Sequence, residues 1–204
     1  MTCEHCCMNC TQKGEDMSLE VWESVIDLCK YGDFPDISIG GGEPTLHPFF
    51  WRIICDSIGT FEHPWLATNG SVTKTSITLA NMAKKGVIGC ALSQDDYHDT
   101  IDEKVIHAFT HEKPKYQSPS SKDSREIRNV TGEESNAGRW QGQGERVCPC
   151  DCILVKPNGD VLSCACEDAI CFGNVLTNVT IPENWDQEAC THDQEVKEWR
   201  LVEL

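Results

Sequence analysis

The sequence predicts an α/β protein with a parallel sheet, followed by a small cysteine-rich β-hairpin module. Short apolar β-type runs alternate with helical segments three to four times in about the first hundred residues, a pattern that favours right-handed β–α–β crossovers. Of the 204 residues, 39% are hydrophobic, as in an ordinary globular protein. The cysteines, fourteen in all, gather towards both ends of the chain.

The first predicted helix covers residues 17–31, where apolar residues recur at helical spacing after the N-cap residue Ser18 and before Gly32. Three further helices are predicted, over 49–58, 73–84 and 101–112. Strands are predicted over 36–39, 65–68, 87–93 and 124–130. Cys55 and Cys90 are predicted core residues of a helix and a strand, because unmodified cysteine is commonly buried.

Near the other end, residues 153–156 and 160–163 flank Pro157-Asn158-Gly159 and predict a β-hairpin. We divide the chain into a core over 1–130, a polar, glycine-rich linker over 131–147, and a cysteine module over 148–204 that ends in a helix.

Composition argues against several classes of protein. A net charge of −16 disfavours binding to a nucleic-acid backbone. No apolar run approaches the roughly 18 residues of a membrane span, and no secretory signal precedes the first cysteines, so we expect a cytoplasmic protein with no membrane partner. A secreted, disulfide-linked protein is the disfavoured alternative, because the α/β body needs no covalent cross-links.

The first ten residues contain Cys3, Cys6, Cys7 and Cys10. Cys3, Cys7 and Cys10 follow the order C-x3-C-x2-C. Three thiolates on one short loop can hold three irons of a [4Fe–4S] cluster and leave the fourth iron open to a substrate or cofactor. From spacing alone, a zinc knuckle and a set of disulfides remain alternatives.

A glycine loop follows the first predicted strand, with Gly40, Gly41 and Gly42 before Glu43 and Pro44. Glycines at a strand end let the backbone approach a ligand closely, and a carboxylate there can accept hydrogen bonds from an ammonium group. Taken by itself, the loop is more simply interpreted as a plain turn.

The cysteine loop and the Gly-Gly-Gly-Glu-Pro loop together resemble the radical S-adenosylmethionine (radical SAM) superfamily. The resemblance implies a partial (β/α)6 barrel, a [4Fe–4S] cluster, and a glycine loop that binds the amino group of the cofactor's methionine moiety. It also implies that strand ends carry cofactor or substrate contacts, since parallel α/β folds place chemistry at that edge. The implied cofactor-binding residues are Gly41, Gly42, Glu43, Pro44, Asn69, Ser93 and Asp95.

The chain departs from the family pattern at its start. Only Met1 and Thr2 precede Cys3, where a first barrel strand would stand. A second interpretation makes Cys3, Cys6 and a cysteine upstream of Met1 the ligands, in an N-terminally truncated reading frame. We take Cys3, Cys7 and Cys10 as the ligands and keep Cys6 as the alternative.

The C-terminal module resembles the SPASM and twitch modules that bind auxiliary clusters. Cys148, Gly159 and Cys164 obey C-x10-G-x4-C, and a Gly-Asn element follows at Gly173. The resemblance implies one auxiliary iron–sulfur cluster, for which zinc is the physical alternative. Its ligands would be Cys148, Cys164, Cys166 and Cys171, with Cys150 and Cys152 as alternatives.

The resemblance implies an oxidoreductase or maturase-like enzyme. It would cleave S-adenosylmethionine reductively, with an electron from an external low-potential donor, and form a 5′-deoxyadenosyl radical that abstracts hydrogen from a peptide or small metabolite. The cofactor would carry the chemistry and the protein would position it, so no catalytic residue is assigned beyond the cluster. The alternative is a non-catalytic iron–sulfur or zinc protein derived from the same fold, acting in electron transfer or binding.

Overall fold

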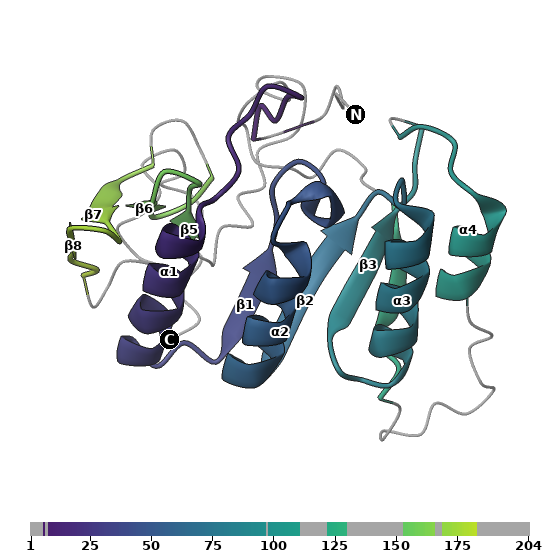
Figure 1. Ribbon diagram of the computed structural model, residues 1–204, viewed down its shortest axis with the longest axis horizontal. Helices are drawn as coiled ribbons and strands as arrows, with labels where there is room; N and C mark the ends of the chain where they lie inside the picture. Colours follow the sequence, from purple (N-terminus) through teal and green to yellow (C-terminus); the bar gives the residue numbers. More distant parts are fainter. Residues whose placement is uncertain are drawn as a thin grey trace, which may run out of the picture.

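The computed structural model describes residues 6, 8–96, 98–110, 122–129, 153–165 and 169–182. Within these residues the chain forms a four-stranded parallel sheet flanked by helices, and a second four-stranded sheet that is antiparallel (Figure 1). The predicted linker 131–147 and the predicted C-terminal helix lie outside the described residues.

The parallel sheet has the order β1-β2-β3-β4, and each neighbouring pair is parallel. Its strands are β1 (Asp36–Ile39), β2 (His63–Thr68), β3 (Gly89–Ser93) and β4 (Arg125–Arg128). The helices are α1 (Leu19–Tyr31), the 3-10 helix η1 (Pro44–Leu46), α2 (Phe50–Thr60), α3 (Thr73–Lys84) and α4 (Glu103–Phe109). The sequential strand order with helices between the strands agrees with the predicted parallel α/β arrangement. The closing of this sheet into a partial barrel is not shown and stays a prediction.

Local capping signals set both ends of α1 and the start of α4. The Ser18 hydroxyl accepts a hydrogen bond from the Val21 N–H at 3.2 Å and caps α1, and the Gly32 N–H donates to the Leu28 carbonyl at its other end. α4 begins later than predicted, because Asp102 accepts a hydrogen bond from the Lys104 N–H and acts as its N-cap.

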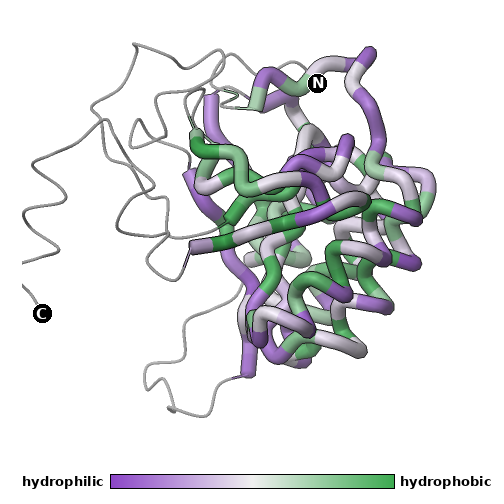
Figure 2. Tube along the Cα trace, turned by 90° about the vertical axis from the view of Figure 1, so that its left-hand side faces the viewer, coloured by the Kyte–Doolittle hydropathy of each residue, from purple (hydrophilic) through white to green (hydrophobic). Residues whose placement is uncertain are grey.

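The main core lies between the strands and the helices. Leu66 of β2, Leu92 of β3 and Leu79 of α3 are at most 1% exposed and belong to one cluster with side chains of α2 and α4. Burial of each such side chain stabilises the fold by about 1.5–3 kcal/mol. A second cluster joins α1 to α2 around Trp22 and Ile53. Figure 2 shows hydrophobic residues along the inner segments and hydrophilic residues in the outer loops.

The strand register defines a second face of the parallel sheet, on the side away from Leu66 and Leu92. We call it the far face. Side chains alternate between the two faces of a strand, so Trp65 and Gly89, which are paired, share this face with Ser93 and Arg128. The far face therefore carries small and polar residues beside one tryptophan.

The antiparallel sheet consists of β5 (Leu154–Val155), β6 (Asp160–Leu162), β7 (Cys171–Asn174) and β8 (Asn178–Val179). The predicted hairpin is confirmed, since β5 pairs with β6 across the Pro-Asn-Gly turn, in which Gly159 has a φ of 91°. Val155 and Val175 pack against the cluster of α1 and α2, so this sheet lies beside α1 (Figure 1).

None of the helices in the described part of the chain combines the length and apolar character that a membrane crossing requires.

Candidate functional site

The carboxyl ends of β1, β2 and β3 bring several predicted site residues to one edge of the parallel sheet. The loop 40–44 follows β1, Asn69 follows β2, and Ser93 ends β3, with Asp95 just beyond it. The N-terminal segment lies at this same edge, above the arrowheads of the strands (Figure 1). Residues far apart in sequence thus converge where parallel α/β proteins place their chemistry.

The cysteine loop packs directly on the glycine loop. A Cβ placed on Gly42 would lie 3.3 Å from the Cβ and 3.9 Å from the Sγ of Cys10. Its neighbour Gly41 has a φ of 131°, a backbone conformation that residues with a side chain rarely adopt. The glycines therefore serve both the turn and the close approach of Cys10.

Within the cysteine loop, the Sγ of Cys6 accepts a hydrogen bond from the backbone N–H of Cys10 at 3.3 Å, and both residues are half-buried. Cys3 and Cys7 lie outside the described residues. Among the residues that are described, no group of three or more His, Cys, Asp or Glu side chains is placed to hold a metal ion. The choice between Cys7 and Cys6 as a cluster ligand therefore stays a prediction.

His47 anchors the segment that follows the cysteine loop. Its Nε2 donates to the Met17 carbonyl at 3.0 Å, and its Nδ1 accepts from the Phe49 N–H at 3.1 Å. A carbonyl can only accept and a backbone N–H can only donate, so this pattern requires the neutral ring with its proton on Nε2. The contact ties the entrance of α1 to the loop after β1, and the sequence analysis did not identify it.

The Glu43 carboxylate joins the glycine loop to the end of β2. Its Oε1 accepts from the Thr45 N–H at 3.2 Å, the Thr45 hydroxyl at 2.5 Å and the Thr68 hydroxyl at 2.8 Å. Its Oε2 accepts from the Asn69 N–H at 2.7 Å. Each carboxylate oxygen has two lone-pair positions, so Oε2 keeps one for the predicted ammonium contact. Pro44 is buried at the start of η1 beside this network.

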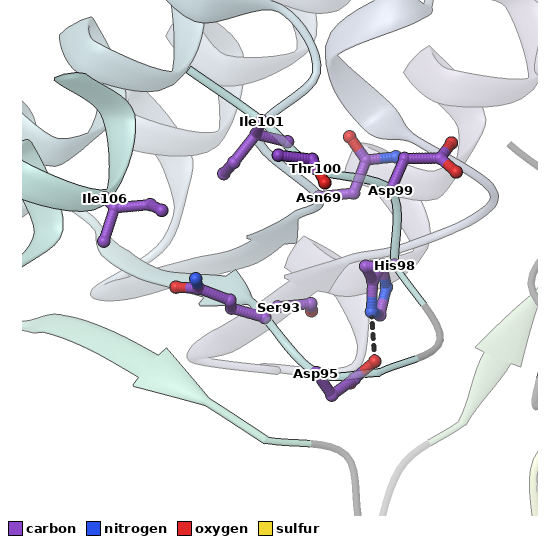
Figure 3. A pocket seen from close by; sticks show the side chains of 9 residues that line it. Asn69, Ser93, Asp95, His98, Asp99, Thr100, Ile101 and Ile106 are labelled. Carbon is purple, nitrogen blue, oxygen red and sulfur yellow. Dashed lines mark hydrogen bonds and ion pairs between the residues drawn. The ribbon is translucent and has the colours of Figure 1, made fainter. Parts of the chain in front are cut away.

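A pocket of about 170 Å³ lies at the end of β3, beside the Asn69 loop (Figure 3). Its lining residues are Asn69, Ser93, Gln94, Asp95, His98, Asp99, Thr100, Ile101 and Ile106. Three of the predicted cofactor-binding residues therefore share one pocket.

Inside this pocket, Asp95 is engaged with His98. Its Oδ1 lies 2.7 Å from the His98 Nδ1, and the side chains of Asp95 and His98 are 3% and 9% exposed (Figure 3). A carboxylate in this position orients the imidazole and favours a proton on Nδ1. Asp95 thus positions a histidine that sequence reasoning did not select, although the Asp-x-x-His spacing was a signal for it.

Two other cysteines differ from each other in their surroundings. Burial, with a smaller contribution from the negative charge of Glu43, raises the pKa of the Cys90 thiol to about 12, and Cys90 is fully buried as predicted. The prediction that Cys55 belongs to the core is wrong, because it is exposed on α2. The buried face of α2 is formed instead by Phe50, Ile53, Ile54 and Ser57.

Two cysteines of the C-terminal module are described. Cys164 is buried at 3% exposure, whereas Cys171 is exposed at the start of β7. The Ser163 N–H donates to the Ile170 carbonyl at 2.9 Å, so the residues that precede these two cysteines lie side by side. Cys148, Cys150, Cys152 and Cys166 lie outside the described residues, and the auxiliary ligand set stays a prediction.

Comparisons of the chain with protein families, with curated proteins and with solved structures found no match.

Proposed function

We propose that the chain is a radical SAM enzyme, which binds a [4Fe–4S] cluster on its N-terminal cysteines and S-adenosylmethionine on its glycine loop. The observation that carries this proposal is the contact between Cys10 and Gly42. The two sequence motifs behind the resemblance are separated by about thirty residues, yet they pack on each other at the carboxyl edge of a parallel sheet.

The donor set of the cysteine loop is chemically suited to such a cluster. Cysteine thiolates are the usual ligands of [4Fe–4S] clusters, and a backbone N–H that donates to sulfur, as Cys10 N–H does to Cys6, stabilises a thiolate. A bound cluster would supply the electron for cleavage of the sulfonium cofactor. The same thiolates also suit zinc, so metal identity needs its own measurement.

The glycine loop and Glu43 have distinct tasks in this proposal. No atom of the described residues lies within 4 Å of the position of a Cβ added to Gly40, so this part of the structure leaves the backbone there open to a ligand. Glu43 holds the loop against β2 through Thr68 and Asn69, and its Oε2 has one acceptor position left for an ammonium group. Asn69 and Ser93 extend the binding edge towards the pocket.

The decisive experiment is anaerobic reconstitution with iron and sulfide, followed by dithionite and S-adenosylmethionine. We expect 5′-deoxyadenosine, detected by mass spectrometry, and its loss in Cys10→Ser. The matched control is Cys55→Ser, which changes an exposed cysteine on α2. An intact cluster with no cofactor cleavage would support the non-catalytic iron–sulfur alternative, and stoichiometric zinc in place of iron would support a zinc protein.

A second test addresses the contact between the two loops. Gly42→Val adds atoms where Cys10 already lies 3.3 Å from a Cβ, so we expect reduced iron incorporation. Gly40→Val is the matched control, because the described residues leave space open at that position. Equal iron content in the two variants would contradict the proposed packing of the cysteine loop on the glycine loop.

We propose further that the C-terminal module binds one auxiliary cluster and that the substrate is a peptide or a small metabolite. The support is the hydrogen bond between Ser163 and Ile170, the residues that precede Cys164 and Cys171, together with the spacing of the cysteines around them. An external low-potential donor would supply the electron.

A further inference from the structure

Three large apolar side chains are exposed close together where the glycine loop leads into α2. Leu46 of η1 is 64% exposed, and Phe49 and Trp51 are each 44% exposed. We call these three residues the apolar rim. Phe50, between two of them, is buried in the main core, so the rim is a second apolar surface of the same segment. Aromatic residues are enriched at protein interfaces, and the rim therefore has the composition of a docking surface.

The apolar rim lies next to the candidate site. η1 directly follows Glu43, the residue whose carboxylate joins the glycine loop to β2. His47, the neighbour of Leu46 in sequence, bonds to the Met17 carbonyl, so the rim also borders the segment that follows the cysteine loop. The start of α2 and the N-terminal segment both lie at the carboxyl edge of the parallel sheet (Figure 1). A chain bound to the rim would therefore have its adjoining residues within reach of the proposed cofactor site.

Carboxylates border the apolar rim on the side of α1. Glu15 and Asp16 come just before Met17, and Glu20 follows in the first turn of α1, and all three are exposed. Within the described residues, none of the three has an ion-pair partner. Lys13 is the only lysine or arginine in the stretch 8–29. The surface thus combines exposed apolar side chains with an excess of negative charge, in a chain of net charge −16.

We propose that the apolar rim and the adjoining carboxylates dock a cationic peptide with apolar side chains, as the substrate of the proposed enzyme. This inference rests on the proposed function for the role of the peptide as substrate, and it narrows the substrate from a peptide or small metabolite to a basic peptide. Charge complementarity selects this occupant, because opposite charges steer association and like charges suppress it. A second copy of the chain, or an acidic electron-donor protein, would bring two strongly negative surfaces together.

The test measures binding of fluorescein-labelled synthetic peptides to the full-length protein by fluorescence anisotropy. The first peptide, KLAKLLKKLAKL, carries both lysines and leucines. One control, ELAELLEELAEL, keeps the leucines and reverses the charge, and the other, KSAKSSKKSAKS, keeps the lysines and lacks the leucines. We expect a dissociation constant on the order of 10–100 μM for the first peptide and at least about tenfold weaker binding of both controls.

A pair of apolar substitutions locates the binding surface. Leu46→Ser combined with Phe49→Ser should weaken binding of the first peptide about tenfold, because two apolar contacts are lost. Both side chains are exposed, so the fold should be kept. Tyr31→Ser is the matched control, since Tyr31 is 93% exposed at the other end of α1. It should leave binding unchanged.

A pair of charge substitutions tests the carboxylates. Glu15→Gln combined with Asp16→Asn should weaken binding roughly threefold at low salt and less at high salt, because salt screens exposed charges. Glu62→Gln combined with Glu126→Gln is the matched control. It removes the same amount of charge at exposed positions, one just before β2 and one on β4. Equal weakening by the two pairs would overturn the inference, because only the net charge of the protein would then matter.

Other outcomes would also overturn it. These are equal binding of the three peptides, no binding of the first peptide, and unchanged binding in the Leu46 and Phe49 double variant. A dimer of the parent protein in sedimentation that this variant lacks would assign the rim to a second copy. Cofactor cleavage lost with reduced flavodoxin, but kept with dithionite, in a variant that still binds the peptide would assign the rim to the electron donor. Peptide binding needs no cluster, so docking can fail while 5′-deoxyadenosine still forms, or hold while it does not.

Discussion

Replacing Glu43 by glutamine tests the hydrogen-bond network that joins the glycine loop to β2. The most favourable placement of the glutamine amide keeps its oxygen at the Oε1 position. Three donors converge there: the N–H and hydroxyl of Thr45 and the hydroxyl of Thr68. The NH2 group then replaces Oε2, which in the parent protein accepts from the Asn69 N–H at 2.7 Å. In the variant two donors face each other at this position, and this hydrogen bond is lost. The opposite placement sets the NH2 group against the donors at Oε1.

The expected loss of stability follows from the number of hydrogen bonds that the variant can no longer accept. At least one hydrogen bond to a charged group is lost, worth about 1.5–3 kcal/mol of unfolding free energy. For a chain of this size that corresponds to a fall of roughly 3–12 °C in the melting temperature. In the proposed function the variant also loses a charged acceptor for the cofactor's ammonium group, so cofactor affinity should fall by roughly one to two decades. Its iron content should equal that of the parent, because no cysteine is changed.

The assay is thermal unfolding by circular dichroism, with isothermal titration of S-adenosylmethionine into the reconstituted protein. Glu62→Gln is the matched control, since Glu62 is exposed and its side chain has no interaction within the described residues. Thr68→Val should destabilise the protein as well, and less than additively with Glu43→Gln, because both remove parts of one network. Equal melting temperatures for the Glu43 and Glu62 variants would refute the network. Unchanged cofactor affinity in Glu43→Gln would mean that the loop is only a turn.

The two proposed clusters and the buried thiol give further predictions. Anaerobically reconstituted protein should hold more iron than one [4Fe–4S] cluster supplies, and replacing Cys164 and Cys166 by alanine should remove roughly half of it; unchanged iron would reject the auxiliary cluster. Purification in air should give colourless or partly disulfide-linked protein, whereas stable brown protein would indicate a closed first cluster. Cys90 should resist alkylation near pH 8 while Cys55 reacts, because burial raises the pKa of Cys90 to about 12. Because of the same raised pKa, the folded state keeps the Cys90 thiol proton at pH values where the unfolded state has released it. The free energy of unfolding should therefore fall as the pH rises from the ordinary cysteine pKa to about 12. A melting temperature independent of pH over this window would contradict this prediction.

The sequence by itself determined the elements of the sheet and their order of alternation. The helix predicted over 73–84 is α3 at the same residues, and apolar periodicity, the Ser18 cap and Gly32 identified α1. The Pro-Asn-Gly turn specified the hairpin of β5 and β6. These features follow from local rules, because caps, turns and helical spacing depend on neighbours within a few residues.

The tertiary structure alone decided which side chains meet. Glu43 finds Thr68 and Asn69 about twenty-five residues away, and His47 reaches back to the carbonyl of Met17. Cys55 is exposed because other side chains of α2 fill the core. Arg128 faces Trp65 only because the parallel register places small residues of β3 between them. Such contacts depend on how distant strands and helices pack, and local sequence patterns contain no information about that packing.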